Sequence, residues 1–142
     1  QAGAADKRVR LPLTLPLCWL KKSMNNYKVH YQLLIELINK IAYRENELIN
    51  ELKGAHFCDE IALEFDNYWS VIKNEYNNPI IKMKILEIDN IFNVYSENKD
   101  EQFWDTYKIP EHKDWDKIKV LSREIIEEIN KKPAQQAGGA DL

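Results

Sequence analysis

The chain has 142 residues, of which 44% are hydrophobic, 30% charged and 11% aromatic, a composition typical of one ordinary globular domain. Its formal net charge is −3, but residues 24–132 alone carry 15 Lys and Arg against 21 Asp and Glu, a net charge of −6. An acidic domain is a poor binder of the nucleic-acid backbone, because that affinity comes from clustered Lys and Arg. We therefore expect no nucleic-acid partner for this region.

The N-terminal segment, residues 1–23, combines basic and apolar side chains. Its stretch KRVRLPLTLPLCWLKK imitates a signal peptide, but two prolines interrupt the apolar run and no small-residue cleavage site follows. The run is also shorter than the roughly 20 residues that a membrane-spanning helix needs. The two cysteines, Cys18 and Cys58, show no spacing typical of a disulfide framework. We therefore expect a cytoplasmic protein without a membrane partner, and we expect Leu11–Leu20 to pack in extended form against the bundle or a second chain.

Two helices are predicted in the first half of the chain. The first covers Asn26–Leu52, and it ends at Gly54, a residue that suits the left-handed conformation after a helix. The apolar stripe of this helix is widened on one side by Ile35, Ala42 and Ile49. The stripe itself consists of Tyr27, Tyr31, Leu34, Ile38, Ile41, Leu48 and Leu52. The apolar period then resumes over Phe57–Tyr76, which predicts the second helix.

A third helix is predicted to begin at Pro79, with Asn78 as its cap, because proline is tolerated in the first turn. Its apolar seam consists of Ile81, Ile85, Ile88, Phe92 and Tyr95. The segment IIKMKI, residues 80–85, also alternates with period two, so a strand is the alternative there.

Two helical segments are predicted in the last part of the chain. Asp100 is expected to cap a short helix carrying Phe103, Trp104 and Tyr107, and the last main helix begins near Asp114. The side chains that this last helix is expected to bury are Trp115, Ile118, Leu121, Ile125 and Ile129.

Four main helices with short connections predict an all-α fold, namely an antiparallel four-helix bundle with an extended N-terminal arm. We accordingly divide the chain into an arm over residues 1–23, a helical domain over 24–132 and a C-terminal tail over 133–142.

The helical domain has a surplus of aromatic residues, which has two interpretations. One is packing in the core and along helix seams. The other is a partner interface or a pocket between helices, since Trp and Tyr contribute strongly to binding per residue. The residues that we assign to such an interface or pocket are Trp69, Tyr76, Trp104, Tyr107 and Trp115.

No motif in the chain indicates catalysis, a metal or a cofactor. Four residues that can bind metals lie close together in the sequence, namely His56, Cys58, Asp59 and Glu60. Zinc sites usually need a second pair of ligands, and the sequence holds no second cluster. The glycine-rich phosphate loop and the nucleophile elbow are both missing. We therefore expect no catalytic residue, no metal and no cofactor, and the sequence does not favour an enzyme.

The two ends of the chain are nearly identical, with QAGAAD at residues 1–6 and QAGGAD at 136–141. Residues 134–136 can be encoded with the string GCCCAAC and residues 16–18 with GTTATGC. These ends resemble translated recombination sites of integron gene cassettes, so the chain resembles an integron cassette-encoded protein. The resemblance implies a bacterial, mobile gene and a native start at Met24. It covers the two ends alone and implies no activity for the helical domain.

The acidic domain, the aromatic surplus and the missing catalytic motifs together favour a small protein–protein interaction module. Its partner is expected to be a second copy, as in a homodimer, or another protein, as for immunity proteins and antitoxins. The alternative is a small-molecule binding module with an aromatic-lined pocket between its helices.

Overall fold

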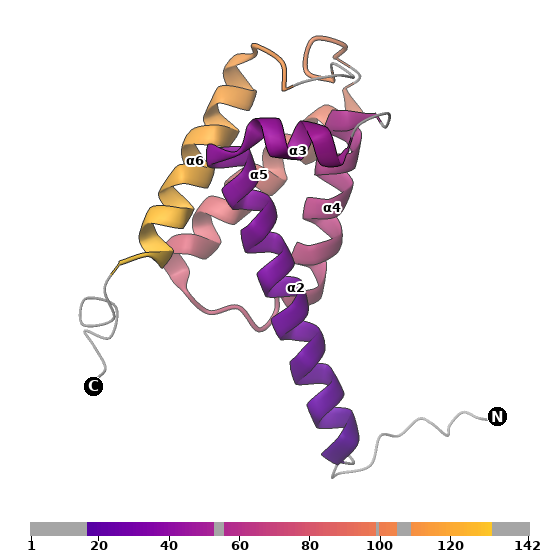
Figure 1. Ribbon diagram of the computed structural model, residues 1–142, viewed down its shortest axis with the longest axis vertical. Coiled ribbons are helices and arrows are strands. Elements are labelled where there is room, and N and C mark those ends of the chain that lie inside the picture. Colours follow the sequence, from indigo (N-terminus) through magenta and orange to yellow (C-terminus); the bar gives the residue numbers. More distant parts are fainter. Residues whose placement is uncertain (1–16, 53–55, 99, 105–108, 132–142) are drawn as a thin grey trace, which may run out of the picture.

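The computed structural model describes residues 17–52, 56–98, 100–104 and 109–131, with side chains described from Met24 onward. These ranges hold helices and no strand, so the predicted all-α class is confirmed for them (Figure 1). IIKMKI is helical, and the alternative of a strand is wrong there. The helices are α2 (Leu17–Tyr43), α3 (Glu45–Glu51), α4 (Phe57–Ile72), α5 (Pro79–Glu97) and α6 (Lys113–Ile129).

The four longer helices pack around one apolar core. Helix α2 lies against both α4 and α6, α5 packs mainly on α6, and the short α3 crosses one end of α2 (Figure 1). Each helix contributes the apolar stripe that its sequence period predicts. Core side chains that are fully buried include Leu34, Ile38, Ile61, Phe65, Ile85, Ile88, Trp115, Ile118 and Ile125. Burial of these stripes is the main force that holds the helices together.

The first helix starts earlier than its apolar pattern predicted. It begins at Leu17 rather than Asn26, so the expected extended conformation is wrong for residues 17–20. Pro16 directly precedes the first helical residue, and no proline follows it within α2, so no residue blocks the helix beyond that point. The rest of the expected extended segment, residues 11–16, lies outside the described residues. In Figure 1 the first turns of α2 extend beyond the other helices.

The same predicted helix is interrupted at Arg44, which separates α2 from α3. Arg44 has φ −133° and ψ 47°, outside the helical region. From α6, the Nε–H of Arg123 donates to the carbonyl oxygen of Ala42 at 3.2 Å. A carbonyl near the end of α2 thus has a partner from another helix, which favours ending α2 here. The predicted stop, Gly54, lies outside the described residues.

The ends of α4 and α5 lie close to the predicted positions. Helix α4 ends at Ile72, four residues before the predicted end, although the amide of Tyr76 still donates to the carbonyl of Ile72 at 2.9 Å. At the start of α5, Asn78 Oδ1 accepts from the amides of Ile80 and Ile81 at 3.1 and 3.2 Å. With Pro79 in the first turn, the predicted cap is confirmed.

In the described part of the connection between α5 and α6, residues 101–104 form a turn where a short helix was predicted, and Tyr107 of that predicted helix lies outside the described residues. Asp100 Oδ1 accepts from the amide of Gln102 at 2.9 Å, so Asp100 does cap this turn. Helix α6 begins one residue before the predicted Asp114. Its cap is His112, whose Nδ1 accepts from the Asp114 amide at 3.1 Å.

Candidate functional site

The aromatic residues assigned from the sequence to an interface or pocket lie mostly in the core. Trp69, Tyr76 and Trp115 have exposed fractions of 2%, 8% and 0%. Trp104 is half-buried, and Tyr107 lies outside the described residues. The structure therefore favours core packing over a partner surface for the three buried side chains. They belong to two separate clusters at opposite ends of the molecule.

The first cluster, here called the Phe103 cluster, closes the end of the molecule where α5 connects to α6. It consists of Phe92, Tyr95, Phe103, Trp104, His112 and Trp115. Phe103 stacks on Tyr95 at 3.9 Å and on Trp115 at 5.0 Å between ring centroids. The indole N–H groups of Trp115 and Trp104 donate to the carbonyls of Phe103 and Tyr95 at 2.8 and 2.9 Å.

The phenol of Tyr95 completes the polar contacts of the Phe103 cluster. Its hydroxyl donates to Asp114 Oδ2 at 2.5 Å. This bond to a carboxylate, assisted by partial burial, raises the pKa of Tyr95 to about 12. The indoles and the phenol of this cluster all have partners, so the cluster has a structural role.

The second cluster, here called the tyrosine cluster, consists of Tyr27, Tyr31, Trp69 and Tyr76. Tyr31 stacks on Tyr27 and Tyr76 with centroids 6.4 and 5.6 Å apart, and Trp69 meets Tyr76 edge to face at 6.2 Å. Burial, followed by the neighbouring Tyr31, raises the pKa of Tyr76. The Nε1–H of Trp69 is buried and finds no acceptor among the described residues. Buried donors without a partner are uncommon in folded proteins. Trp69 contacts Tyr76, which in turn stacks on Tyr31, a residue that lines a surface groove.

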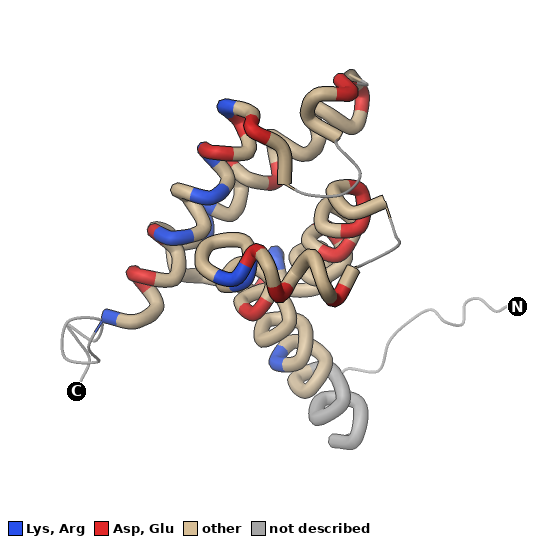
Figure 2. Tube along the Cα trace, turned by 45° about the horizontal axis from the view of Figure 1, so that its top comes forward, with Lys and Arg blue, Asp and Glu red and all other residues tan. Residues whose placement is uncertain are grey.

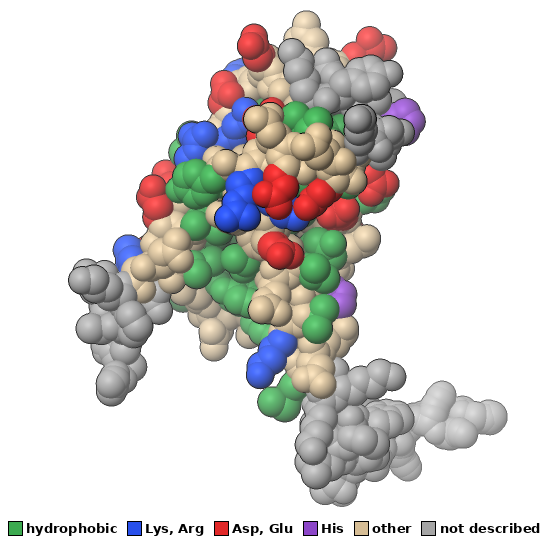
Figure 3. Space-filling view, in the orientation of Figure 1, with side chains coloured by type: hydrophobic (Ala, Val, Ile, Leu, Met, Phe, Trp, Pro, Cys, Tyr) green, Lys and Arg blue, Asp and Glu red, His purple; other side chains and the backbone are tan. Residues whose placement is uncertain are grey.

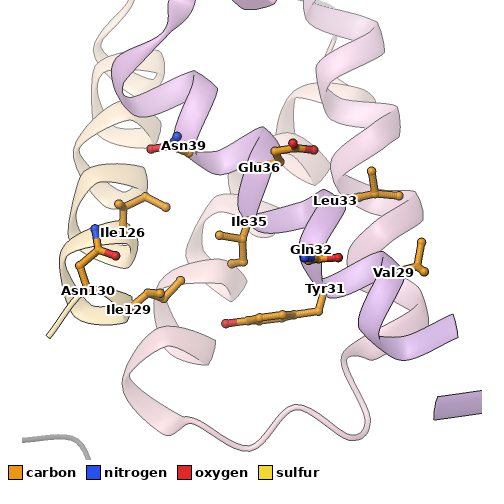
Figure 4. A pocket seen from close by; sticks show the side chains of 10 residues that line it. All are labelled: Val29, Tyr31, Gln32, Leu33, Ile35, Glu36, Asn39, Ile126, Ile129 and Asn130. Carbon is orange, nitrogen blue, oxygen red and sulfur yellow. The ribbon is translucent and has the colours of Figure 1, made fainter. Parts of the chain in front are cut away.

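The groove, here called the α2–α6 groove, has a volume of about 570 Å³. It opens where α2 and α6 diverge from each other, and Figure 4 shows side chains of both helices lining it. Its lining residues are Val29, Tyr31, Gln32, Leu33, Ile35, Glu36, Asn39, Ile126, Ile129 and Asn130. Tyr31 therefore links the tyrosine cluster with the surface.

The lining is apolar between the helices and polar around the edge. Tyr31 and Ile35 reach from α2 toward Ile126 and Ile129 of α6 (Figure 4). Three amide side chains, Gln32, Asn39 and Asn130, and one carboxylate, Glu36, supply the polar part. In the space-filling view, apolar side chains gather between these two helices (Figure 3). An apolar centre with a polar rim is typical of a binding site for a protein segment.

Sequence reasoning did not identify this groove. It assigned Tyr31, Ile35 and Ile129 to the apolar stripes of their helices, and all three are half-buried against the core. The sequence did contain one indication of the groove, namely that Ile35 widens the apolar stripe of α2. When a stripe is wider than the area that one neighbouring helix covers, part of its apolar surface stays exposed. The position of the groove depends on where α2 diverges from α6. That divergence results from contacts between distant parts of the chain, so the local sequence pattern does not predict it.

The groove lies on a molecule whose described part is acidic, and its own lining holds one carboxylate, Glu36. The described side chains include 20 Asp and Glu against 11 Lys and Arg, a net charge of −9. Helix α4 holds four Asp and Glu and no Lys or Arg, whereas both signs alternate along α6 (Figure 2). Beside the groove, Lys40 on α2 pairs with Glu51 at 2.8 Å. Burial, together with the neighbouring Glu60, raises the pKa of Glu64 on α4.

The polar group at the start of α4 does not form a metal site. Cys58 is buried, while His56 and Asp59 are exposed. Within the part of the chain that the structure describes, no three His, Cys, Asp or Glu side chains lie together in a way that could hold a metal ion. Among these same residues, no helix combines the length and the apolarity that crossing a membrane requires.

Comparison with known proteins gives no family for the chain: no family model matches it, and neither a curated protein nor a solved structure does. The α2–α6 groove and its surroundings are therefore the features from which we infer a function.

Proposed function

We propose that this protein is a protein–protein interaction module whose α2–α6 groove binds a basic, amphipathic helix of its partner. The observation that carries the proposal is the groove itself, with an apolar centre, a polar rim and a volume of about 570 Å³ on an acidic domain. Binding of an amphipathic helix in an apolar groove is a recurring mode of recognition between proteins.

The dimensions of the groove suit a short helix. Its lining on α2 runs from Val29 to Asn39, a span of about 15 Å at 1.5 Å per residue. A bound helix of roughly three turns would match this length, with apolar residues at positions i, i+3 or i+4 and i+7. Those residues would contact Tyr31, Ile35 and Ile129 and bury surface that is exposed in the single chain.

The charges favour a basic partner over a second copy of the helical domain. Glu36 is the carboxylate of the groove lining, and the described residues carry a net charge of −9. Two such surfaces repel each other, whereas Lys or Arg on a partner gains attraction and faster association. Self-association through the groove is therefore the less favourable arrangement.

The test uses a fluorescent 18-residue Leu/Lys peptide with helical amphipathic spacing, and a Leu/Glu peptide of the same pattern. We expect the Leu/Lys peptide to bind with a fluorescence anisotropy change, and the Leu/Glu peptide to bind at least tenfold more weakly. Ile129→Lys places a charge within the groove and should weaken binding of the Leu/Lys peptide at least tenfold. Glu36→Gln should weaken it about threefold, the effect of one exposed charge pair.

The matched control is Leu63→Lys on α4, which makes the same change in charge at a side chain that is 57% exposed and outside the groove. This variant should bind the Leu/Lys peptide within twofold of the unmodified protein. If Ile129→Lys and Leu63→Lys weaken binding equally, the peptide is attracted by the overall charge of the protein, and binding in the groove is refuted. A dimer in sedimentation equilibrium that Ile129→Lys dissociates would identify a second copy as the occupant instead.

A small-molecule binding module is the second candidate, and the volume of the groove is the observation that favours it. Ligand pockets commonly enclose about 300–1,000 Å³, and the α2–α6 groove lies within this range. Its lining differs from the aromatic-lined pocket expected from the sequence, since Tyr31 is its one aromatic residue. A compound that raises the Tm of the protein but not that of Ile129→Lys would support this candidate.

A further inference from the structure

A second hollow lies at the opposite end of the contact between α2 and α6, where α3 begins. Its volume is about 440 Å³, and we call it the cationic hollow. Its lining residues are Ile41, Ala42, Tyr43, Arg44, Glu45, Asn46, Lys119 and Arg123. In Figure 3, Lys and Arg side chains gather on the surface near the junction of α3 with α6. None of these residues belongs to the α2–α6 groove.

Three cations and one carboxylate line this hollow, in contrast to the acidic surface around it. Arg44 stands at the break between α2 and α3, and Lys119 and Arg123 lie one turn apart on α6. The described residues as a whole hold almost two acidic side chains for each basic one. An excess of positive charge in a concave surface of such a protein attracts anions selectively.

The existing contacts leave these cations able to bind an anion. The Nε–H of Arg123 is fixed on the carbonyl of Ala42 at 3.2 Å, and no ion pair involves Arg123 within the described ranges. This bond orients the guanidinium and leaves its two terminal amino groups for another acceptor. Lys119 pairs with Glu45 at 3.2 Å and Arg44 with Glu47 at 3.7 Å. Partly exposed pairs of this kind are weak and can exchange for a stronger anion.

We propose that the cationic hollow binds the phosphate group of a small phosphorylated molecule. A phosphate monoester carries close to two negative charges and three acceptor oxygens, which matches two guanidinium groups and one ammonium group. Arginine binds such oxygens with two parallel hydrogen bonds, and lysine adds a compact charge. The volume exceeds that of phosphate alone, so the rest of the molecule lies against Tyr43 and Asn46, which complete the lining.

The test is a titration of the whole protein with inorganic phosphate and with ribose 5-phosphate at constant ionic strength, followed by ¹⁵N NMR. We expect saturable shifts of the amides at residues 42–46 and 119–123, with no comparable shifts around Tyr31 and Ile35. Ribose 5-phosphate should bind at least as tightly as inorganic phosphate. Lys119→Gln and Arg123→Gln should each weaken binding of both probes at least fivefold.

Lys117→Gln is the matched control, because it removes one positive charge from the same helix outside the hollow. Its side chain is 55% exposed and pairs with Glu87 at 3.5 Å. Affinity for phosphate should stay within twofold in this variant. Shifts that do not saturate, or equal losses in Lys117→Gln and Lys119→Gln, would overturn the proposal. Lys119→Gln serves as the primary variant because Arg123 also holds the end of α2.

Discussion

The two aromatic clusters use similar side chains but differ in how completely their polar atoms are paired. In the Phe103 cluster, both indole N–H groups and the Tyr95 hydroxyl have acceptors. In the tyrosine cluster, the indole N–H of Trp69 has no acceptor among the described residues. The first cluster closes its end of the core, whereas the second continues through Tyr31 into the α2–α6 groove.

This difference shows that aromatic content alone does not locate a binding surface. Most aromatic side chains of the described residues stabilise the fold, and the groove is lined largely by aliphatic and amide side chains. A better indicator in this molecule is apolar surface between two diverging helices, next to an aromatic cluster whose polar atoms are not all paired. Substitutions in the two clusters test whether that distinction holds.

The largest effect is expected from Trp115→Ala in the Phe103 cluster. Trp115 is fully buried and contacts both Phe92 and Phe103. Its truncation should reduce the free energy of unfolding by about 3–5 kcal/mol, since it removes apolar contacts and leaves a cavity. Urea denaturation followed by circular dichroism measures the loss. A loss below about 1 kcal/mol would show that the cluster does not hold this end of the core.

A matched pair of substitutions compares the clusters directly. Trp115→Phe leaves the Phe103 carbonyl without its indole donor, whereas Trp69→Phe removes a donor that has no acceptor within the described chain. Both variants lose a similar volume. Trp115→Phe should therefore cost about 1–2 kcal/mol more than Trp69→Phe.

Urea midpoints of the two variants, measured under identical conditions, give this difference. If Trp69→Phe proves the more costly, its indole N–H has a polar partner in solution. The two clusters would then not differ in how completely their indole N–H groups are paired.

The smallest effect is expected from Tyr95→Phe. Loss of the bond to Asp114 should reduce stability by about 1 kcal/mol at neutral pH, because the bond is only partly buried. The pKa of Tyr95 is raised from 10.0 to about 12 in the folded chain, so the folded state holds this proton more tightly than the unfolded state. The stabilising contribution is complete below pH 10 and is lost as the pH rises to about 12.

Urea denaturation at pH 8, 10 and 12 should therefore show a gap between Tyr95→Phe and the unmodified protein that closes with increasing pH. A gap that stays constant across this range would mean that the hydroxyl does not act through Asp114.

Sequence periodicity predicted the helical class and most of the core. Most side chains of the predicted stripes of α2, α5 and α6 are buried, whereas Tyr31, Tyr95 and Ile129 at the stripe ends are half-buried. The cap at Asn78 follows from local chemistry. The break at Arg44 was not predicted, because the donor that pairs with Ala42 comes from Arg123 on the last helix. Similarly, the groove and the cationic hollow depend on how α2 and α6 cross, which arises from contacts between distant parts of the chain.

The contact between Arg123 and Ala42 also has a consequence for folding. The two residues are separated by 81 positions, so their hydrogen bond closes a loop that contains most of the described chain. Such a contact forms only after the entropy of bringing distant segments together has been overcome. The bend that starts α3 is therefore completed when the last helix docks on the first, and local opening of α6 withdraws the donor that holds it. The backbone geometry at the start of α3 therefore depends on whether α6 is docked on α2, although the two helices are far apart in the sequence.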